Sequence, residues 1–174
     1  MPTAKAAEIF AGVGEYYTDK KDIDNSINFF REAVTLDPKN VKAQKGYSEA
    51  LSAKANEYLV NEDTSKAKSF FLESLKYDAN NAAAYFGLGE VYTDLDQTDD
   101  AIASYEKALK SDGKLSEIYF PLGILYYQKG EIAKADDLLT KSAATSDENA
   151  ETEVLIGVIR ISQNRTEEAM KAFQ

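Results

Sequence analysis

The sequence predicts an all-α solenoid built from antiparallel helix pairs, and two observations lead to this fold class. First, the segment YFGLGEVY at residues 85–92 recurs in closely similar form as YFPLGILY at residues 119–126. Second, apolar residues recur at three- and four-residue spacing, which places them on one face of a helix. A single helix pair cannot bury such a face, so successive pairs must stack on one another.

Two rows of equivalent positions define the repeat. In the first row, a small residue precedes a large one by three positions: Gly14, Ala55, Gly89, Gly123 and Gly157 before Tyr17, Tyr58, Tyr92, Tyr126 and Arg160. The first step of this row is longer than the three equal steps that follow it, and the equal step, as from Tyr92 to Tyr126, is the repeat length. In the second row, a small residue precedes a large one by four positions, and another small residue follows: Ser26, Ala67, Ala101, Ala135 and Ala169, then Phe30, Phe71, Tyr105, Leu139 and Phe173, then Ala33, Ser74, Ala108 and Ala143. Small residues beside large ones allow two helices to approach closely.

These rows predict one domain over residues 1–174 with five units: residues 7–40, 41–81, 82–115, 116–149 and 150–174, the last incomplete. In each unit the first helix carries the first row and the second helix carries the second row. Polar turns join them, with Gly130 and Asn164 where a left-handed residue is expected. Thr64, Thr98 and Thr166 are expected to cap the returning helices.

Two departures from the period leave alternatives open. The second unit is seven residues longer, and residues 41–63 are expected to form one helix of about five to six turns. This is either a tolerated extension or a spur that contacts a partner, and the end that protrudes is left open. Pro121 either kinks the first helix of the fourth unit or lies harmlessly in its first turn.

The repeat resembles that of the tetratricopeptide repeat (TPR) family. The family pattern of a large residue, Leu-Gly, Tyr, Ala, Phe, Ala and Pro is matched in the fourth unit by Tyr119, Leu122, Gly123, Tyr126, Ala135, Leu139, Ala143 and Asp147. The resemblance implies a right-handed superhelix in which the first helices of successive units line a concave groove. It also implies that this groove binds an extended peptide or a helix of a partner protein.

On this resemblance, the positions of the first helices that face away from the packing line the groove. They form an acidic row and, toward the C-terminal half, an apolar patch: Glu8, Glu15, Glu49, Asn56, Phe86, Glu90, Glu117, Phe120, Ile124, Tyr127, Glu151 and Val154. One interpretation is a groove that offers aromatic anchors beside carboxylates and so prefers basic or apolar segments. In the other, the glutamates only solvate a helix face and the phenylalanines complete the packing.

The fifth unit suggests a second hypothesis. Its first helix is apolar, and no polar capping helix follows, whereas natural solenoids end in a solvating cap. We therefore expect either that the chain is part of a longer protein or that another copy covers this end. The candidates for self-association are Ile156, Ile159, Met170 and Phe173. The alternative function is accordingly a self-assembling scaffold.

Composition narrows the remaining functions. The chain has no histidine and no cysteine, which excludes imidazole relays, thiolate catalysis, disulfides and the usual zinc ligands. The acidic segment at residues 94–100 lacks the glycine and the glutamate of a calcium loop. We expect no enzyme activity, no catalytic residue, no cofactor and no metal.

The formal charge of −10 disfavours nucleic acid, and no apolar run is long enough to span a bilayer. We therefore expect a protein or peptide partner, or a second copy of the chain, with no nucleic-acid partner and no membrane insertion. The compartment is left open.

Overall fold

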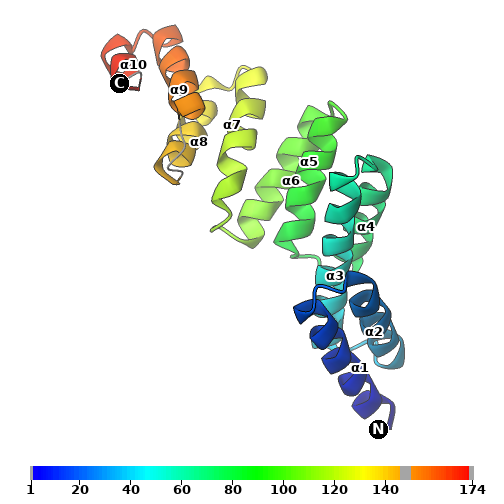
Figure 1. Cartoon of the computed structure of the whole chain (residues 1–174). Helices are drawn as coiled ribbons and strands as arrows, with labels where there is room; N and C mark the ends of the chain where they lie inside the picture. The colour runs from blue at the N-terminus through cyan, green and yellow to red at the C-terminus, as the bar shows by residue number, and fades with distance from the viewer. Residues whose placement is uncertain (1, 146–149, 173–174) are drawn as a thin grey trace. The chain divides into compact units, whose positions relative to one another are not determined.

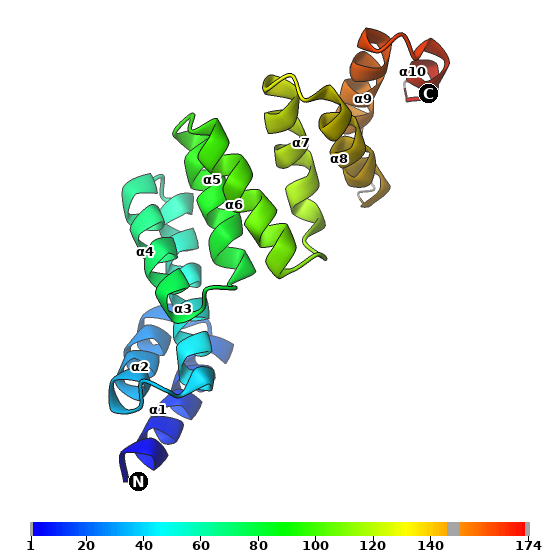
Figure 2. The same cartoon turned by 180° about the vertical axis from the view of Figure 1, so that it is seen from behind.

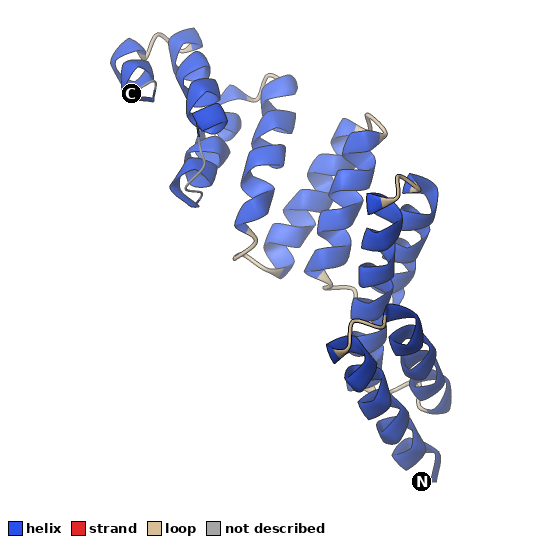
Figure 3. Ribbon diagram, in the orientation of Figure 1, coloured by secondary structure: helices blue, strands red, loops and turns tan. Residues whose placement is uncertain are grey.

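The computed structural model describes residues 2–145 and 150–172, and within them all regular structure is helical (Figure 3). The predicted all-α fold class is therefore confirmed. The chain divides into two compact units, unit 1 at Met1–Ser111 and unit 2 at Asp112–Gln174.

Unit 1 contains three antiparallel helix pairs that follow one another along the chain (Figure 1). Its helices are α1 (Pro2–Asp19), α2 (Ile23–Leu36), α3 (Val41–Val60), α4 (Thr64–Tyr77), α5 (Ala82–Asp94) and α6 (Thr98–Ser111). Each second helix packs on its own first helix, and α2 and α4 also pack on the first helix that follows. The first helices α1, α3 and α5 contact one another in order.

Unit 2 contains the 3₁₀ turn η1 (Ser116–Ile118) and the helices α7 (Tyr119–Gln128), α8 (Ile132–Thr145), α9 (Ala150–Ser162) and α10 (Thr166–Ala172), seen from behind in Figure 2. Pro121 is the third residue of α7. The first four N–H groups of a helix have no acceptor within it, so proline removes no hydrogen bond at this position. The prediction that Pro121 lies harmlessly in the first turn is confirmed.

The helix starts correct one expectation. Asp63, and not Thr64, caps α4, because its carboxylate accepts a hydrogen bond from the Lys66 N–H at 3.1 Å and the helix begins at Thr64. Thr98 and Thr166 are likewise the first residues of α6 and α10. Side-chain oxygens cap α2, α3 and α5 in the same way as α4, from Asp22, Asn40 and Asn81.

The turn inside each helix pair contains one residue with left-handed backbone. The five residues are spaced like the repeat itself: Lys21, Glu62, Asp96, Gly130 and Asn164, with φ between 56° and 75°. The expectation for Gly130 and Asn164 is confirmed. Non-glycine residues pay a steric penalty in this conformation, so the periodic turn geometry is imposed by the packing of the two helices.

Aromatic rings fill the space beside the small residues, as the two rows predicted. A Cβ atom on Gly89 would lie 2.5 Å from the Tyr105 ring, and a Cβ atom on Gly87 would lie 2.0 Å from the Phe71 ring. The assignment of Ala143 is wrong by one residue. Ser142 follows Ala108 by one repeat length and is the buried residue at this position.

The seven extra residues of the second unit lie in the middle of α3. In α5, two glycines leave room for two rings. Gly87 contacts Phe71 of the preceding helix pair, and Gly89, two residues later, contacts Tyr105 of the same pair. In α3, the glycine that contacts the ring of the preceding pair, Phe30, is Gly46. The residue equivalent to Gly89 is Ala55, which lies nine residues later. Seven residues add about 10 Å of helix between the two packing sites and keep nearly the same face.

Both halves of α3 are packed. Ala43, Tyr47 and Leu51 belong to the core shared with α2, and Ala55 belongs to the core shared with α4 and α5. The packing agrees with a tolerated extension and leaves neither end of α3 as an unpacked spur. The most exposed large apolar residues of α3 are Val41 and Val60, at its two ends.

A buried polar cluster lies where α3, α4 and the start of α5 meet. The Asn81 Nδ2 atom lies 2.9–3.0 Å from the hydroxyl oxygens of Ser48, Ser52 and Ser74, which share its two N–H donors, and the Ser74 hydroxyl donates to the Ser48 carbonyl at 2.8 Å. The Asn81 Oδ1 atom accepts from the Ala84 N–H and caps α5. One side chain thus ties together three helices in the interior of unit 1.

Candidate partner-binding surface

The predicted groove residues belong to the first helices of the pairs, and they fall into both units. Unit 1 carries Glu8, Glu15, Glu49, Asn56, Phe86 and Glu90, and unit 2 carries Glu117, Phe120, Ile124, Tyr127, Glu151 and Val154. The two groups are considered separately. The single groove through all of them stays a prediction.

In unit 1, the acidic row is partly neutralised by two lysines. The Lys42 Nζ atom lies 2.8 Å from the Glu15 carboxylate, and the Lys45 Nζ atom lies 3.9 Å from the Glu49 carboxylate. These four residues border a cleft of about 290 Å³ between α1 and α3, with Phe30 and Gly46 also in its lining. Asp19 also lines the cleft, so its charge is mixed, with three carboxylates against two lysines.

Sequence reasoning missed Lys42 and Lys45 because it aligned the second unit only across the longer first step of the repeat. The N-terminal half of α3 follows α1 by one ordinary repeat length instead, so Lys45 is equivalent to Ala11 and Glu49 to Glu15. The two glycines Gly12 and Gly46, which are also one repeat length apart, were the signal that could have revealed this register.

Further along unit 1, α5 presents one aromatic and one acidic residue. The half-buried Phe86 ring packs on the Tyr105 ring at a centroid distance of 5.8 Å. Burial, and secondarily the Asp94 carboxylate, raises the pKa of Glu90. Glu8 on α1 and Asn56 on α3 are exposed. Phe86 is therefore fixed by packing and presents only part of its ring to a partner.

In unit 2, apolar side chains dominate the outward faces of both first helices. Phe120 and Ile124 on α7 are partly exposed, and Tyr127 more so. Val154, Val158 and Ile161 follow one another at helical spacing on α9, and each leaves about half of its surface to solvent. Six apolar residues on two helices thus lack a covering element among the described residues.

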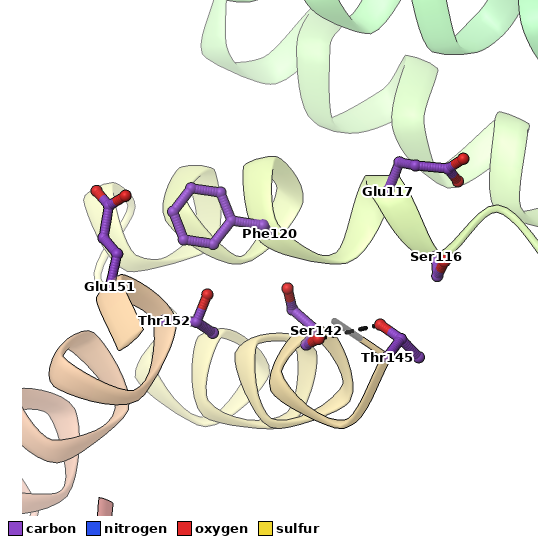
Figure 4. Close-up of a pocket in the computed structure, with 7 residues that line it drawn as sticks. All are labelled: Ser116, Glu117, Phe120, Ser142, Thr145, Glu151 and Thr152. Atoms are coloured by element: carbon purple, nitrogen blue, oxygen red, sulfur yellow. Dashed lines mark hydrogen bonds between the residues drawn. The ribbon is translucent and has the colours of Figure 1, made fainter. Parts of the chain in front are cut away.

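A pocket of about 400 Å³ lies between the start of α7, the end of α8 and the start of α9 (Figure 4). Among the described residues that line it, Phe120 is the one apolar residue and the others are polar: Ser116, Glu117, Ser142, Thr145, Glu151 and Thr152. Each of these polar side chains can accept a hydrogen bond, and the described lining contains no lysine or arginine. The pocket therefore suits a ligand that donates hydrogen bonds and carries positive charge.

The structure corrects half of the self-association prediction. Ile156 and Ile159 are almost completely buried in the core of unit 2, so they leave no surface for a second copy. Met170 on α10 is exposed, and Phe173 lies outside the described residues. The exposed apolar residues of α9 lie on the face predicted to line the groove.

An ionic cluster holds the last helices of unit 2 together. The Asp136 carboxylate on α8 accepts from the Arg160 Nε atom on α9 at 3.2 Å and also from the Arg165 guanidinium before α10. Arg165 pairs in addition with Glu168 at 2.6 Å. Arg160 occupies the tyrosine position of the repeat, and a charge pair replaces the aromatic contact there.

No helix within residues 2–145 or 150–172 is both long enough and apolar enough to cross a bilayer.

Three segments of the chain match repeat-family profiles. Residues 7–40 and 70–103 match profiles described as tetratricopeptide repeat, and residues 89–130 match one described as TPR repeat. Among curated proteins, the TPR repeat-containing protein MJ1428 of Methanocaldococcus jannaschii is 31% identical over 131 residues, which are 74% of this chain and 22% of that protein. The chain spans between 9% and 22% of the length of the curated relatives it matches.

Solved structures share the fold at low identity. The crystal structure of MamA superposes with a TM-score of 0.62 at 22% identity, covering 97% of this chain and 88% of MamA. YrrB, described as a TPR protein with an unusual peptide-binding site, gives a TM-score of 0.63 at 19% identity, covering 94% of this chain and 80% of YrrB.

Proposed function

The chain belongs to the tetratricopeptide repeat family of protein-interaction modules, and we propose that it binds a peptide or helix of a partner protein on the outward faces of its first helices. The observation that carries this proposal is the exposed apolar surface of unit 2, formed by Phe120, Ile124 and Tyr127 on α7 and Val154, Val158 and Ile161 on α9. Each helix presents three such residues, and exposed apolar patches mark interaction sites on soluble proteins.

The charges around this surface favour a basic or apolar segment. Glu117 and Glu151 form no ion pair with another described residue, whereas Lys134 and Lys141 on α8 are each paired with a carboxylate of the same helix or its turn. The carboxylates of Glu117 and Glu151 are thus available to a partner. A basic segment would gain from these carboxylates, while its apolar side chains cover α7 and α9.

The mode of binding follows from the rigidity of the stacked pairs. The first helices are held by α8 and α10 and by the ionic cluster around Asp136, so the surface is already formed before the partner arrives. Pre-organisation confines most of the ordering entropy to the partner segment. The peptide-binding site described for YrrB supports the same mode in a protein of similar fold. None of this requires catalysis by the chain.

The test is selection of peptides from a random displayed library against the 174-residue chain, followed by titration of a selected peptide by calorimetry. The double variant Val154→Ser and Val158→Ser should weaken binding by about tenfold or more, since each valine loses apolar area that the peptide would bury. The matched control is Val41→Ser and Val60→Ser, which changes the same residue types at exposed ends of α3. Equal affinity of both double variants and the wild type would overturn the proposal.

The alternative, a scaffold that associates through its last pair, is favoured by the exposed Met170 on α10. The mass measured by light scattering over a concentration series separates the two. A mass that rises with concentration and stays at 19.2 kDa in Met170→Glu would support self-association. A constant mass of 19.2 kDa for the wild type would exclude it at those concentrations.

A further inference from the structure

The pocket between α7, α8 and α9 is lined by two largely buried residues whose hydroxyl groups have no partner among the described residues. Ser142 and Thr152 are only 8% and 6% exposed, and neither hydroxyl forms a hydrogen bond with another described residue. No side-chain polar atom sealed from solvent in the described residues is without a partner, so these oxygens are open to the pocket. Because a hydroxyl oxygen can accept hydrogen bonds, both side chains can accept one from a ligand in the pocket.

The charge of the pocket comes from carboxylates at its ends. In the view of Figure 4, Glu117 and Glu151 lie at opposite ends, with Phe120 on one side between them and Ser142 and Thr152 on the other. Because neither glutamate is paired with a described residue, their charge is available to a ligand. A cation large enough to reach from the Glu151 carboxylate to the hydroxyls of Ser142 and Thr152 could donate hydrogen bonds to all three groups.

Phe120 decides which cation fits best. Its partly exposed ring forms one wall, and cations bind to aromatic faces, guanidinium groups in particular because they are planar and stack. A guanidinium also has five N–H donors in a fixed fork, enough for a carboxylate and two hydroxyls at once. An ammonium group has three donors on one atom and cannot stack, so it would satisfy fewer of these groups.

We propose that this pocket takes the guanidinium group of an arginine side chain, which stacks on Phe120 and donates to Glu151, Ser142 and Thr152. The arginine would belong to the partner segment, so in this respect the inference rests on the proposed function. It adds a specific anchor at the N-terminal ends of α7 and α9, beside the apolar faces of the same two helices.

The probe for the experiment is N-acetyl-arginine N-methylamide, titrated into the isotopically labelled chain and followed by NMR. The matched probe is its citrulline analogue, which has nearly the same shape but no charge. We expect saturable shifts of the amide signals of Phe120, Ser142 and Thr152 with the arginine probe, and at least fivefold weaker binding of the citrulline probe. Equal binding of the two probes, or shifts scattered over both units, would overturn the proposal.

Two variants test the residues named. Glu151→Gln and Thr152→Val should each weaken the arginine probe at least threefold, whereas Glu167→Gln, an equal change of charge on the exposed face of α10, should leave its affinity unchanged. The circular dichroism spectrum and thermal midpoint of each variant show whether it is folded. Unchanged affinity in a folded Glu151→Gln variant would exclude the proposed contact.

The outcome does not depend on finding a natural partner. If the arginine probe binds the pocket but no library peptide depends on Val154 and Val158, the pocket is supported and the apolar groove is not. If peptides require the two valines but the arginine probe does not bind, the reverse holds.

Discussion

The ring of Phe30 occupies the place where a Cβ atom on Gly46 would lie, at 2.3 Å from the Phe30 Cε1 atom. The ring is almost completely buried, and it also lies against Gly14. A Cβ atom added to Gly14 would lie 2.9 Å from Phe30 Cγ. Phe30 thus joins α1, α2 and α3 through two glycines that leave room for it.

Gly46→Ala should therefore destabilise unit 1. The ring of Phe30 cannot move far in a packed core, and overpacking of this kind costs about 1–3 kcal/mol. The control is Gly12→Ala, at the equivalent position of α1, where a Cβ atom would have no neighbour within 4 Å. There, better helix propensity should stabilise the chain by about 0.5–1 kcal/mol. Urea unfolding followed by circular dichroism measures both, and the same sign for the two variants would contradict this account.

Asn81→Ala should cost more than Asn40→Ala, although both residues cap a helix. Loss of a cap costs about 1 kcal/mol. At Asn81 the substitution also removes two N–H donors that three buried serine hydroxyls share, and the loss of these buried hydrogen bonds adds about 1–3 kcal/mol. Chemical denaturation of the two variants tests the difference, and equal losses would show that the buried cluster contributes little.

Asp136→Asn should destabilise unit 2 by about 2 kcal/mol or more, since it leaves the mostly buried Arg160 and the Arg165 guanidinium without their shared carboxylate. The adjacent Asp137→Asn is the matched control. Its pair with Lys141 is exposed, and such pairs contribute about 0–1 kcal/mol. The side chain of Asp136 is 13% exposed and that of Asp137 is 63% exposed, which is the reason for the difference. Thermal unfolding of both variants in moderate salt provides the comparison.

Glu90→Gln should change the dependence of stability on pH. Burial and the Asp94 carboxylate raise the pKa of Glu90 above 4.5 in the folded chain, so the folded state holds this proton more tightly than the unfolded state. Ionised Glu90 therefore lowers stability above the raised pKa, and this cost is absent below 4.5. Relative to wild type, the variant should gain stability as pH rises through this window.

The measurement for Glu90 is the urea midpoint of wild type and variant at a series of pH values from about 3 to 8. Glu8→Gln, the same substitution at an exposed position of α1, is the control for the loss of one carboxylate from the chain. A constant difference for Glu90→Gln would contradict the predicted coupling.

The sequence by itself determined the helix pairs, their period and the residues that pack between them. Small and large residues at fixed helical spacing, such as Gly89 and Tyr105, encode this information locally. At Gly130 the left-handed turn conformation could also be predicted locally, because glycine has no side chain to oppose it. For these features the position along one helix was enough.

The tertiary structure decided which register and which face each residue takes. The seven residues in the middle of α3 give its two halves different partners, so Lys42 and Lys45 lie beside Glu15 and Glu49 in a way that one alignment could not show. Ile156 and Ile159 are buried while Val154 and Val158 on the same helix are exposed, because α8 and α10 cover only one side of α9. Burial depends on neighbours distant in sequence, and the pocket that Phe120 shares with Ser142 and Thr152 exists only where three helices meet.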